Sequence, residues 1–266
     1  MAFFRRLEKL RRSLRWRLRR GVPLWWHVGR PNFGDDINPS LFQRLSTTPI
    51  RLHGDRRRPH LLGAGSILAK ATTSSVVCGS GFLAPPGRGL PSPARVIAVR
   101  GERSLASLGC RADVALGDPV VLVDAMIGQV TKQHRFGLVP HVLSVPHWKA
   151  KATGDVHVID PAHDPWRVVQ EIAACDVIFS QSLHGLIVAD ALGVPNVWIA
   201  PSDRMVGGRF KFDDYFSTLD QPKVCVPLRP ELFSAPGVFA PSVGTYRHSK
   251  DVLRASLAAA CQSLRR

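Results

Sequence analysis

Cysteines are few in this sequence and follow no metal-binding or disulfide pattern. The chain has five, far apart and without a C-x-x-C pair or a short Cys/His cluster: Cys78, Cys110, Cys175, Cys225 and Cys261. A disulfide framework and a structural zinc site are therefore not expected. An odd number of widely spaced cysteines is typical of reduced thiols, and we expect a cytoplasmic protein.

Long apolar runs are absent as well. No window approaches the ~20 apolar residues of a membrane-spanning helix, and no apolar core of an export signal follows the basic N-terminus. We therefore expect neither a spanning helix nor secretion. Hydrophobic residues still make up 45% of the 266 residues and charged residues 21%, which supports one large folded domain or two compact ones.

Several catalytic signatures are missing too. The sequence has no Gly-Lys-Ser/Thr of a Walker loop, no complete G-x-G-x-x-G and no G-x-S-x-G. Its histidines lack the spacing of metal ligands on a helix. We expect no metal and no dinucleotide cofactor.

Acidic residues are fewer than basic residues in this sequence. The chain has 36 Lys and Arg against 20 Asp and Glu, a formal charge of +16. Residues 1–20 hold nine of the bases and one acid, so the remaining chain, with 27 bases and 19 acids, carries +8. Such a body suits anionic small molecules, phospholipid surfaces or nucleic acid, and charge alone does not choose among them.

The first segment predicts a basic amphipathic helix over residues 1–21. Arginines fill most of its other faces, while apolar residues recur every three or four positions: Phe3, Leu7, Leu10, Leu14 and Leu18. A helix of this kind can lie in the headgroup region of an anionic membrane, which is the interpretation we favour. Packing on the protein body, a frayed tail and a nucleic-acid arm are the alternatives, and we expect no nucleic-acid partner.

The rest of the chain predicts an α/β fold. Short apolar runs without alternation are typical of parallel strands buried on both faces. The expected strands are Leu24–Val28, His60–Leu62, Val76–Gly79, Arg95–Val99, Phe136–Val139, Val156–Ile159, Val177–Ser180 and Asn196–Ile199. Between them we expect helices at Asn38–Leu45, Glu102–Ser107, Pro165–Ala174, Gly185–Leu192 and Asp251–Ser263, and a further one within FDDYFSTL.

Apolar density falls near Asp124–Arg135 and then rises again. This dip predicts a domain boundary. We expect two Rossmann-like domains, over residues 22–130 and 131–248, and a C-terminal helix over residues 249–266 that can pack across their junction.

The first candidate site is the segment NFGDDIN, residues 32–38, after the first expected strand. Ligands of open α/β sheets gather at the carboxyl ends of strands. Asp35 or Asp36 can accept a proton from a sugar hydroxyl, and Asn32 and Asn38 can contact the same ligand. The alternative is an ordinary helix cap and turn.

Three further segments supply charge or a proton donor, two of them at strand ends. Arg100 and Arg103 begin a helix directly after a strand, where guanidinium groups bind phosphate or carboxylate well. His184 lies between a strand and a helix, and can donate a proton or pair with an anion. Arg209 and Lys211 follow a glycine pair and can cover an anionic ligand. A solvated arginine pair, a structural histidine and a solvated loop are the respective alternatives.

Taken in order, several motifs resemble those of the polysaccharide pyruvyl transferases. They run over residues 24–219 and read NFGDD, LLGAGSIL, VVCGSGF, VRGERS, LGDPVVL, VIDP, SQSLHGLIVADALGVP and KFDDYF. The resemblance implies a two-domain fold like that of GT-B glycosyltransferases, with phosphoenolpyruvate as the donor in the cleft and no other cofactor. By motif match it assigns Arg100 and His184 to the donor site, where Ser182 stands in place of an arginine that many members carry.

This resemblance gives each candidate a role. Protonation of the methylene carbon of phosphoenolpyruvate makes a cationic centre that a sugar hydroxyl attacks; phosphate leaves and a second hydroxyl closes a ketal. His184 is the expected acid or phosphate partner, and Asp35 or Asp36 activates acceptor hydroxyls. The expected donor-binding residues are Arg100, Arg103, Ser182, Arg209 and Lys211, and the expected acceptor-binding residues are Asn32 and Asn38.

The expected acceptor is a lipid-linked glycan precursor of a cell-surface polysaccharide, met at the inner face of the cell membrane. Two other functions stay open. One is a GT-B glycosyltransferase that uses a nucleotide sugar, although no clear ribose-binding acid is visible in the C-terminal half. The other is a noncatalytic membrane or nucleic-acid adaptor built on the first helix.

Overall fold

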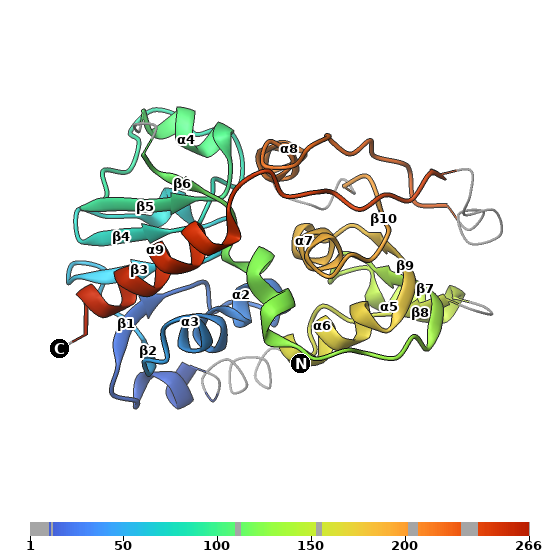
Figure 1. The fold of residues 1–266 in the computed structure, drawn as a ribbon, viewed down its shortest axis with the longest axis horizontal. Helices are drawn as coiled ribbons and strands as arrows, with labels where there is room; N and C mark the ends of the chain where they lie inside the picture. Colours follow the sequence, from blue (N-terminus) through green and yellow to red (C-terminus); the bar gives the residue numbers. More distant parts are fainter. Residues whose placement is uncertain are drawn as a thin grey trace.

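A computed structural model describes residues 11, 13–109, 113–152, 156–201, 207–229 and 239–265. Two sheets lie side by side, and every strand pair within them is parallel (Figure 1). The first sheet has the order β2-β1-β3-β4-β5-β6. Its strands are β1 (Val22–Trp25), β2 (Ile50–Leu52), β3 (His60–Leu62), β4 (Ser75–Cys78), β5 (Arg95–Val99) and β6 (Ala115–Leu116).

The second sheet has the order β10-β9-β7-β8. Its strands are β7 (His134–Val139), β8 (Val156–Val158), β9 (Cys175–Ser180) and β10 (Asn196–Trp198). In each sheet the first strand lies between the second and third, so the strand order reverses there. This pattern confirms the α/β class and is consistent with two Rossmann-like domains.

Helices cover the sheets. They are α2 (Phe33–Asp36), α3 (Asn38–Ser46), α4 (Glu102–Leu108), α5 (Val145–Lys151), α6 (Pro165–Ala173), α7 (Leu183–Ala191), α8 (Phe210–Phe216) and α9 (Lys250–Ser263), with 3₁₀ turns η1 (Leu68–Lys70) and η2 (Pro119–Met126). Local chemistry sets several of their ends. Asp164 accepts hydrogen bonds from the first backbone N–H groups of α6, which has Pro165 at its start, and Ser249 caps α9 in the same way.

The C-terminal helix returns to the first sheet. Figure 1 shows α9 crossing back over β4 and β5, and it also packs against α3 and η2. Its buried residues, Leu253, Leu257, Ala260 and Cys261, recur every three or four positions and form one apolar stripe. The chain thereby ends on the layer where it began.

The sequence analysis did not predict several elements, among them β2, β6 and α5. An arginine interrupts β2, β6 has only two residues, and α5 contains a proline and two lysines, so none has a clear apolar period. Helix α7 also begins at Leu183, two residues earlier than expected, because Ser182 accepts a hydrogen bond from Gly185 N and caps it. This shift puts His184 in the first turn of the helix.

The described part of the N-terminal segment packs on the protein through a face other than the predicted apolar stripe. Residues 1–10 and 12 lie outside the described residues, so most of the predicted helix over 1–21 does as well. Trp16 packs edge-on against Trp26, with ring centroids 6.3 Å apart. Leu14 and Leu18 instead face solvent, 41% and 82% exposed. Among the described residues, no helix is long and apolar enough to cross a membrane.

Candidate active site

A cavity of about 480 Å³ lies where the carboxyl ends of the two sheets meet. Most of its lining comes from the ends of the strands on either side of each order reversal and from the segments that follow them. Trp25 and Ser66 represent β1 and β3 of the first sheet, and His141 and His184 represent β7 and β9 of the second. Both parallel sheets thus present the carboxyl ends of their strands, where ligands of open α/β sheets bind, to one space.

His184 projects from the start of α7 into this cavity, where its partner is a buried carboxylate. Its Nε2 atom lies 3.6 Å from Asp118 Oδ2, and the Asp118 side chain is fully buried. Neither of these two atoms has a hydrogen-bond partner within the described structure. Asp118 Oδ1 accepts from Val120 N at 3.0 Å, which fixes the carboxylate in place. The imidazole is therefore held beside a negative charge and can be stabilised when protonated.

Helix α2 packs directly on the His184 ring. A Cβ atom at Gly34 would collide with His184 Nδ1, so only glycine allows this approach. The ring of Phe33 meets the imidazole edge-on, with centroids 6.2 Å apart. The N-terminal unit therefore helps to orient a histidine that belongs to the C-terminal unit.

The structure separates the residues of the NFGDDIN segment. Asn32 and Asp35 line the cavity. Asp36 lines a neighbouring pocket, and its Oδ2 accepts a hydrogen bond from Asn32 N at 3.0 Å. Asn38 is fully buried and exchanges hydrogen bonds with both backbone groups of Ala64. Asp36 therefore caps the start of α2, and Asn38 holds the loop at Ala64 in place. Asp35 is the carboxylate of this segment that lines the cavity.

Positive charge predominates around this carboxylate. Arg56, Lys70 and Lys211 line the cavity, and among the described lining residues Asp35 is the one acid. Burial, together with the nearby charge of Arg100, lowers the pKa of Lys211 to about 8, although Asp35 opposes both effects. Burial also lowers the pKa of His141, which favours its neutral form. The site suits a small ligand with more than one negative charge.

Arg100 lies behind the cavity wall with its side chain fully buried. Its Nε donates to Asp214 Oδ2 at 2.9 Å, its Nη2 to the Phe82 carbonyl at 2.6 Å and its Nη1 to Ser66 Oγ at 2.8 Å. Ser104 completes the cluster by donating from both N and Oγ to Asp214. The VRGERS and KFDDYF motifs therefore bind each other, and Arg100 reaches the cavity only through Ser66.

The other expected donor-binding residues are divided. Ser182 lines the cavity and caps α7. Arg103 lies outside, half exposed, with its Nη2 3.6 Å from Asp213. Arg209 is also outside: its guanidinium lies 4.9 Å from the centroid of the Trp198 ring. Residues 202–206 of the expected basic loop lie outside the described residues.

Three site residues were not predicted from the sequence: Asp118, His141 and Gln181. Asp118 belongs to the LGDPVVL motif, but a proline after an aspartate also predicts an ordinary cap, and nothing local indicated His184 as its partner. Gln181 accepts a hydrogen bond from His141 N at 3.1 Å and donates to Ala200 O at 3.2 Å, so it braces the cavity rim. Among the described residues, no group of three or more His, Cys, Asp or Glu is arranged to hold a metal ion.

Similar proteins are known. The chain is 29% identical over 212 residues to the succinoglycan biosynthesis protein ExoV of Rhizobium meliloti (strain 1021), a match that covers 74% of this chain and 64% of that protein. It is 24% identical over 215 residues to the uncharacterized protein L143 of Acanthamoeba polyphaga mimivirus, covering 75% of each. A solved structure of a protein of uncharacterized function from Klebsiella pneumoniae matches with a TM-score of 0.42 and 12% identity, over 81% of this chain and 92% of that one.

The family model for polysaccharide pyruvyl transferases matches residues 76–203. This range runs from β4 through β10 and contains Arg100, Asp118 and His184. It also contains the VRGERS, LGDPVVL and SQSLHGLIVADALGVP motifs on which the resemblance depended. Over this range the chain resembles the polysaccharide pyruvyl transferase family.

Proposed function

We propose that the protein transfers the enolpyruvyl group of phosphoenolpyruvate to two hydroxyls of a sugar, forming a pyruvate ketal on a precursor of a cell-surface polysaccharide. The observation that carries this proposal is His184, held against buried Asp118 at the edge of a basic cavity. Phosphoenolpyruvate bears a phosphate and a carboxylate, which match the positive lining. The name of the ExoV relative supports an exopolysaccharide product.

The donor is held by charge. Lys211, Arg56 and Lys70 are the cations that line the cavity and can pair with its two acidic groups. The capped start of α7, at Ser182, adds backbone N–H groups and the positive end of the helix dipole. Arg100 supports this wall through Ser66 without being exposed to the donor.

The reaction balances with these residues. A proton from His184 adds to the methylene carbon, and a sugar hydroxyl attacks the neighbouring carbon as Asp35 accepts its proton. The bond between this carbon and the phosphate oxygen breaks, a second hydroxyl attacks the same carbon, and its proton leaves with phosphate. Proton exchange with solvent then returns Asp35 to its carboxylate form and His184 to its protonated form. Asp118 stabilises the protonated imidazole before transfer, and the products are the ketal and inorganic phosphate.

A direct test is phosphate release from phosphoenolpyruvate by the full chain, with and without candidate glycan acceptors. We expect release only when a suitable acceptor is present, and calorimetric binding of phosphoenolpyruvate in preference to nucleotide sugars. Tight binding of a nucleotide sugar without binding of phosphoenolpyruvate would instead favour a GT-B glycosyltransferase. The two sheets share one cavity, and α9 returns to the first sheet. This arrangement supports a GT-B-like fold for either a pyruvyltransferase or a glycosyltransferase.

We also propose that the enzyme works at the membrane surface on a lipid-linked acceptor. Exposed Leu14 and Leu18 lie among Arg11, Arg15 and Arg17, so apolar and basic groups are presented together. Leu14→Gln/Leu18→Gln leaves the Trp16 contact intact and should reduce sedimentation with anionic vesicles. Added salt should reduce binding of the parent chain. Equal sedimentation by parent and variant would exclude this role for the two leucines.

A further inference from the structure

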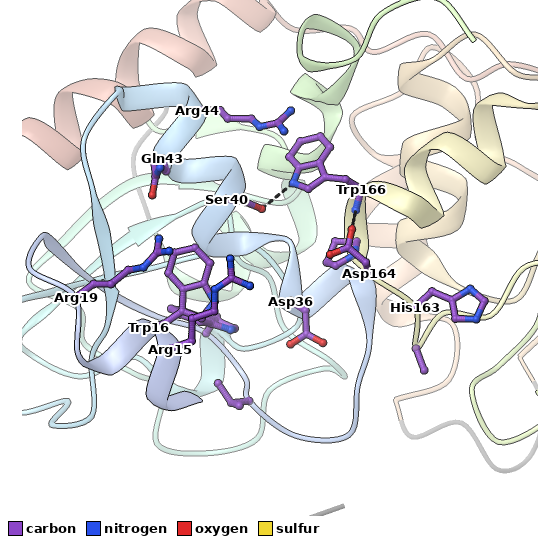
Figure 2. A pocket seen from close by; sticks show the side chains of 14 residues that line it. Arg15, Trp16, Arg19, Asp36, Ser40, Gln43, Arg44, His163, Asp164 and Trp166 are labelled. Carbon is purple, nitrogen blue, oxygen red and sulfur yellow. Dashed lines mark hydrogen bonds between the residues drawn. The ribbon is translucent and has the colours of Figure 1, made fainter. Parts of the chain in front are cut away.

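A second pocket, of about 570 Å³, lies on the other side of α2 from the cavity. Alternate residues line the two spaces: Trp25 and His27 face the cavity, and Trp26 and Val28 face the pocket. The pocket is formed by the N-terminal segment, α3 and the start of α6 (Figure 2). The reaction proposed above uses none of its residues.

Three indole rings and three guanidinium groups line this pocket. The tryptophans are Trp16, Trp26 and Trp166, and the arginines are Arg15, Arg19 and Arg44. The arginines contact the rings: Arg44 lies 3.9 Å from the centroid of Trp166, and Arg19 lies 4.3 Å from that of Trp16. Stacking of this kind fixes the cations without neutralising them, since an aromatic ring carries no net charge.

The remaining polar groups suit hydroxyls. Ser40 accepts a hydrogen bond from Trp166 Nε1 at 2.9 Å, and Gln43 and Asp36 point toward the same space (Figure 2). Asp164 Oδ1 accepts from Trp166 N and Arg167 N, so its charge is partly balanced by the start of α6. Flat apolar faces, hydroxyl partners and guanidinium groups stacked on indole rings together match a saccharide that carries a phosphate.

We propose that this pocket binds a phosphorylated part of the acceptor, remote from the sugar that receives pyruvate. The proposal rests on the proposed function and adds the location and chemistry of acceptor binding. The wall between the two spaces is short: Phe33 N donates to Pro161 O at 2.7 Å across it, and Asp35 and Asp36 face opposite sides. One oligosaccharide can therefore occupy both spaces by passing over this wall.

The test measures binding directly, without turnover. Quenching of tryptophan fluorescence in the full chain reports binding of glucose 1-phosphate, methyl glucoside and inorganic phosphate. We expect glucose 1-phosphate to bind at least tenfold tighter than either of the others. Arg15→Gln/Arg44→Gln should weaken it at least tenfold. Arg57→Gln/Arg88→Gln removes the same charge from exposed positions outside the pocket and should change the affinity less than twofold.

A second arm identifies the source of the phosphate. Neutral phosphatidylcholine vesicles, with or without a polyprenyl diphosphate-linked saccharide, replace the soluble probe. The proposal is supported if the parent chain binds either phosphorylated probe and Arg15→Gln/Arg44→Gln does not. The probe that binds more tightly shows whether the phosphate belongs to a free sugar phosphate or to a lipid carrier. Equal binding by parent and variant, or equal loss in the control pair, overturns the proposal. Because this readout needs no phosphoenolpyruvate, failure of the pyruvyl-transfer assay leaves it interpretable.

Discussion

Two buried ionic clusters of this protein look alike in sequence but differ in whether their charged atoms have hydrogen-bond partners. We call the cluster with all partners present saturated and the other unsaturated. Arg100 and Asp214 are both fully buried and bind each other. Arg100 also donates to the Phe82 carbonyl, and Asp214 also accepts from Ser104. His184 and Asp118 approach at 3.6 Å, and the two facing atoms have no hydrogen-bond partner within the described structure. A saturated cluster stabilises the fold, whereas an unsaturated one at a cavity can still bind or transfer a proton. Motif membership alone does not distinguish them.

The largest expected effect is on the saturated cluster. Arg100→Ala leaves Asp214 buried without its counter-ion, and should lower the free energy of unfolding by about 3 to 5 kcal/mol. Denaturant unfolding of the full chain measures this. Arg103→Ala, on the exposed neighbour, should cost less than about 0.5 kcal/mol. A stable Arg100→Ala protein that had lost only donor affinity would reverse our view of the two clusters.

Changes at the unsaturated cluster should affect rate more than stability. His184→Gln keeps most of the side-chain volume and should lower turnover about 100-fold or more, because it removes the proton donor. Phosphate release measures the rate, and thermal unfolding checks the fold. Unchanged turnover would make His184 a structural residue like Arg100.

Asp118→Asn sharpens the assignment of the pair. Asparagine can still accept the hydrogen bond from Val120 N, so the η2 turn should form, but the charge beside His184 is lost. We expect turnover to fall roughly tenfold with thermal unfolding unchanged, because the carboxylate charge beside the proton donor is lost. A rate loss accompanied by an equal loss of stability would point to packing instead.

The smallest effect concerns Lys211, whose pKa of about 8 lies within the assay range. The side chain is charged below this pH and neutral above it, so affinity for phosphoenolpyruvate should fall, by up to about tenfold, as pH rises from 7 to 9. Lys211→Arg keeps the charge over this range and should flatten the dependence. Calorimetry at several pH values checks both chains. An identical fall in both would show that another group titrates.

The sequence predicted most secondary structure because apolar runs and turn residues act locally. His60–Leu62 and Arg95–Val99 match β3 and β5 in full, and α6 differs by a single residue at its end. Strands β2 and β6 were missed, because an arginine interrupts the first and the second has only two residues. Pairing with a neighbouring strand is what makes them strands. Contacts along the sheet decided those elements.

The candidate site was predicted in part for the same reason. His184, Ser182, Asp35 and Asn32 follow strand ends, and the parallel sheets bring those ends to one cavity. Arg100 also follows a strand end, yet its guanidinium turns into the protein because Asp214 and Phe82 bind it there. Neither partner can be recognised from the residues that flank Arg100.

What the sequence by itself determined is therefore the α/β class, the order of the family motifs and the placement of His184 at the start of a helix. Periodicity, caps and strand ends are properties of neighbouring residues. Only the tertiary structure decided that Asp118 faces His184, that Arg100 is enclosed and that Lys211 is buried enough to lower its pKa. Those outcomes depend on desolvation and charge pairing between distant segments, which arise only when the two sheets come together.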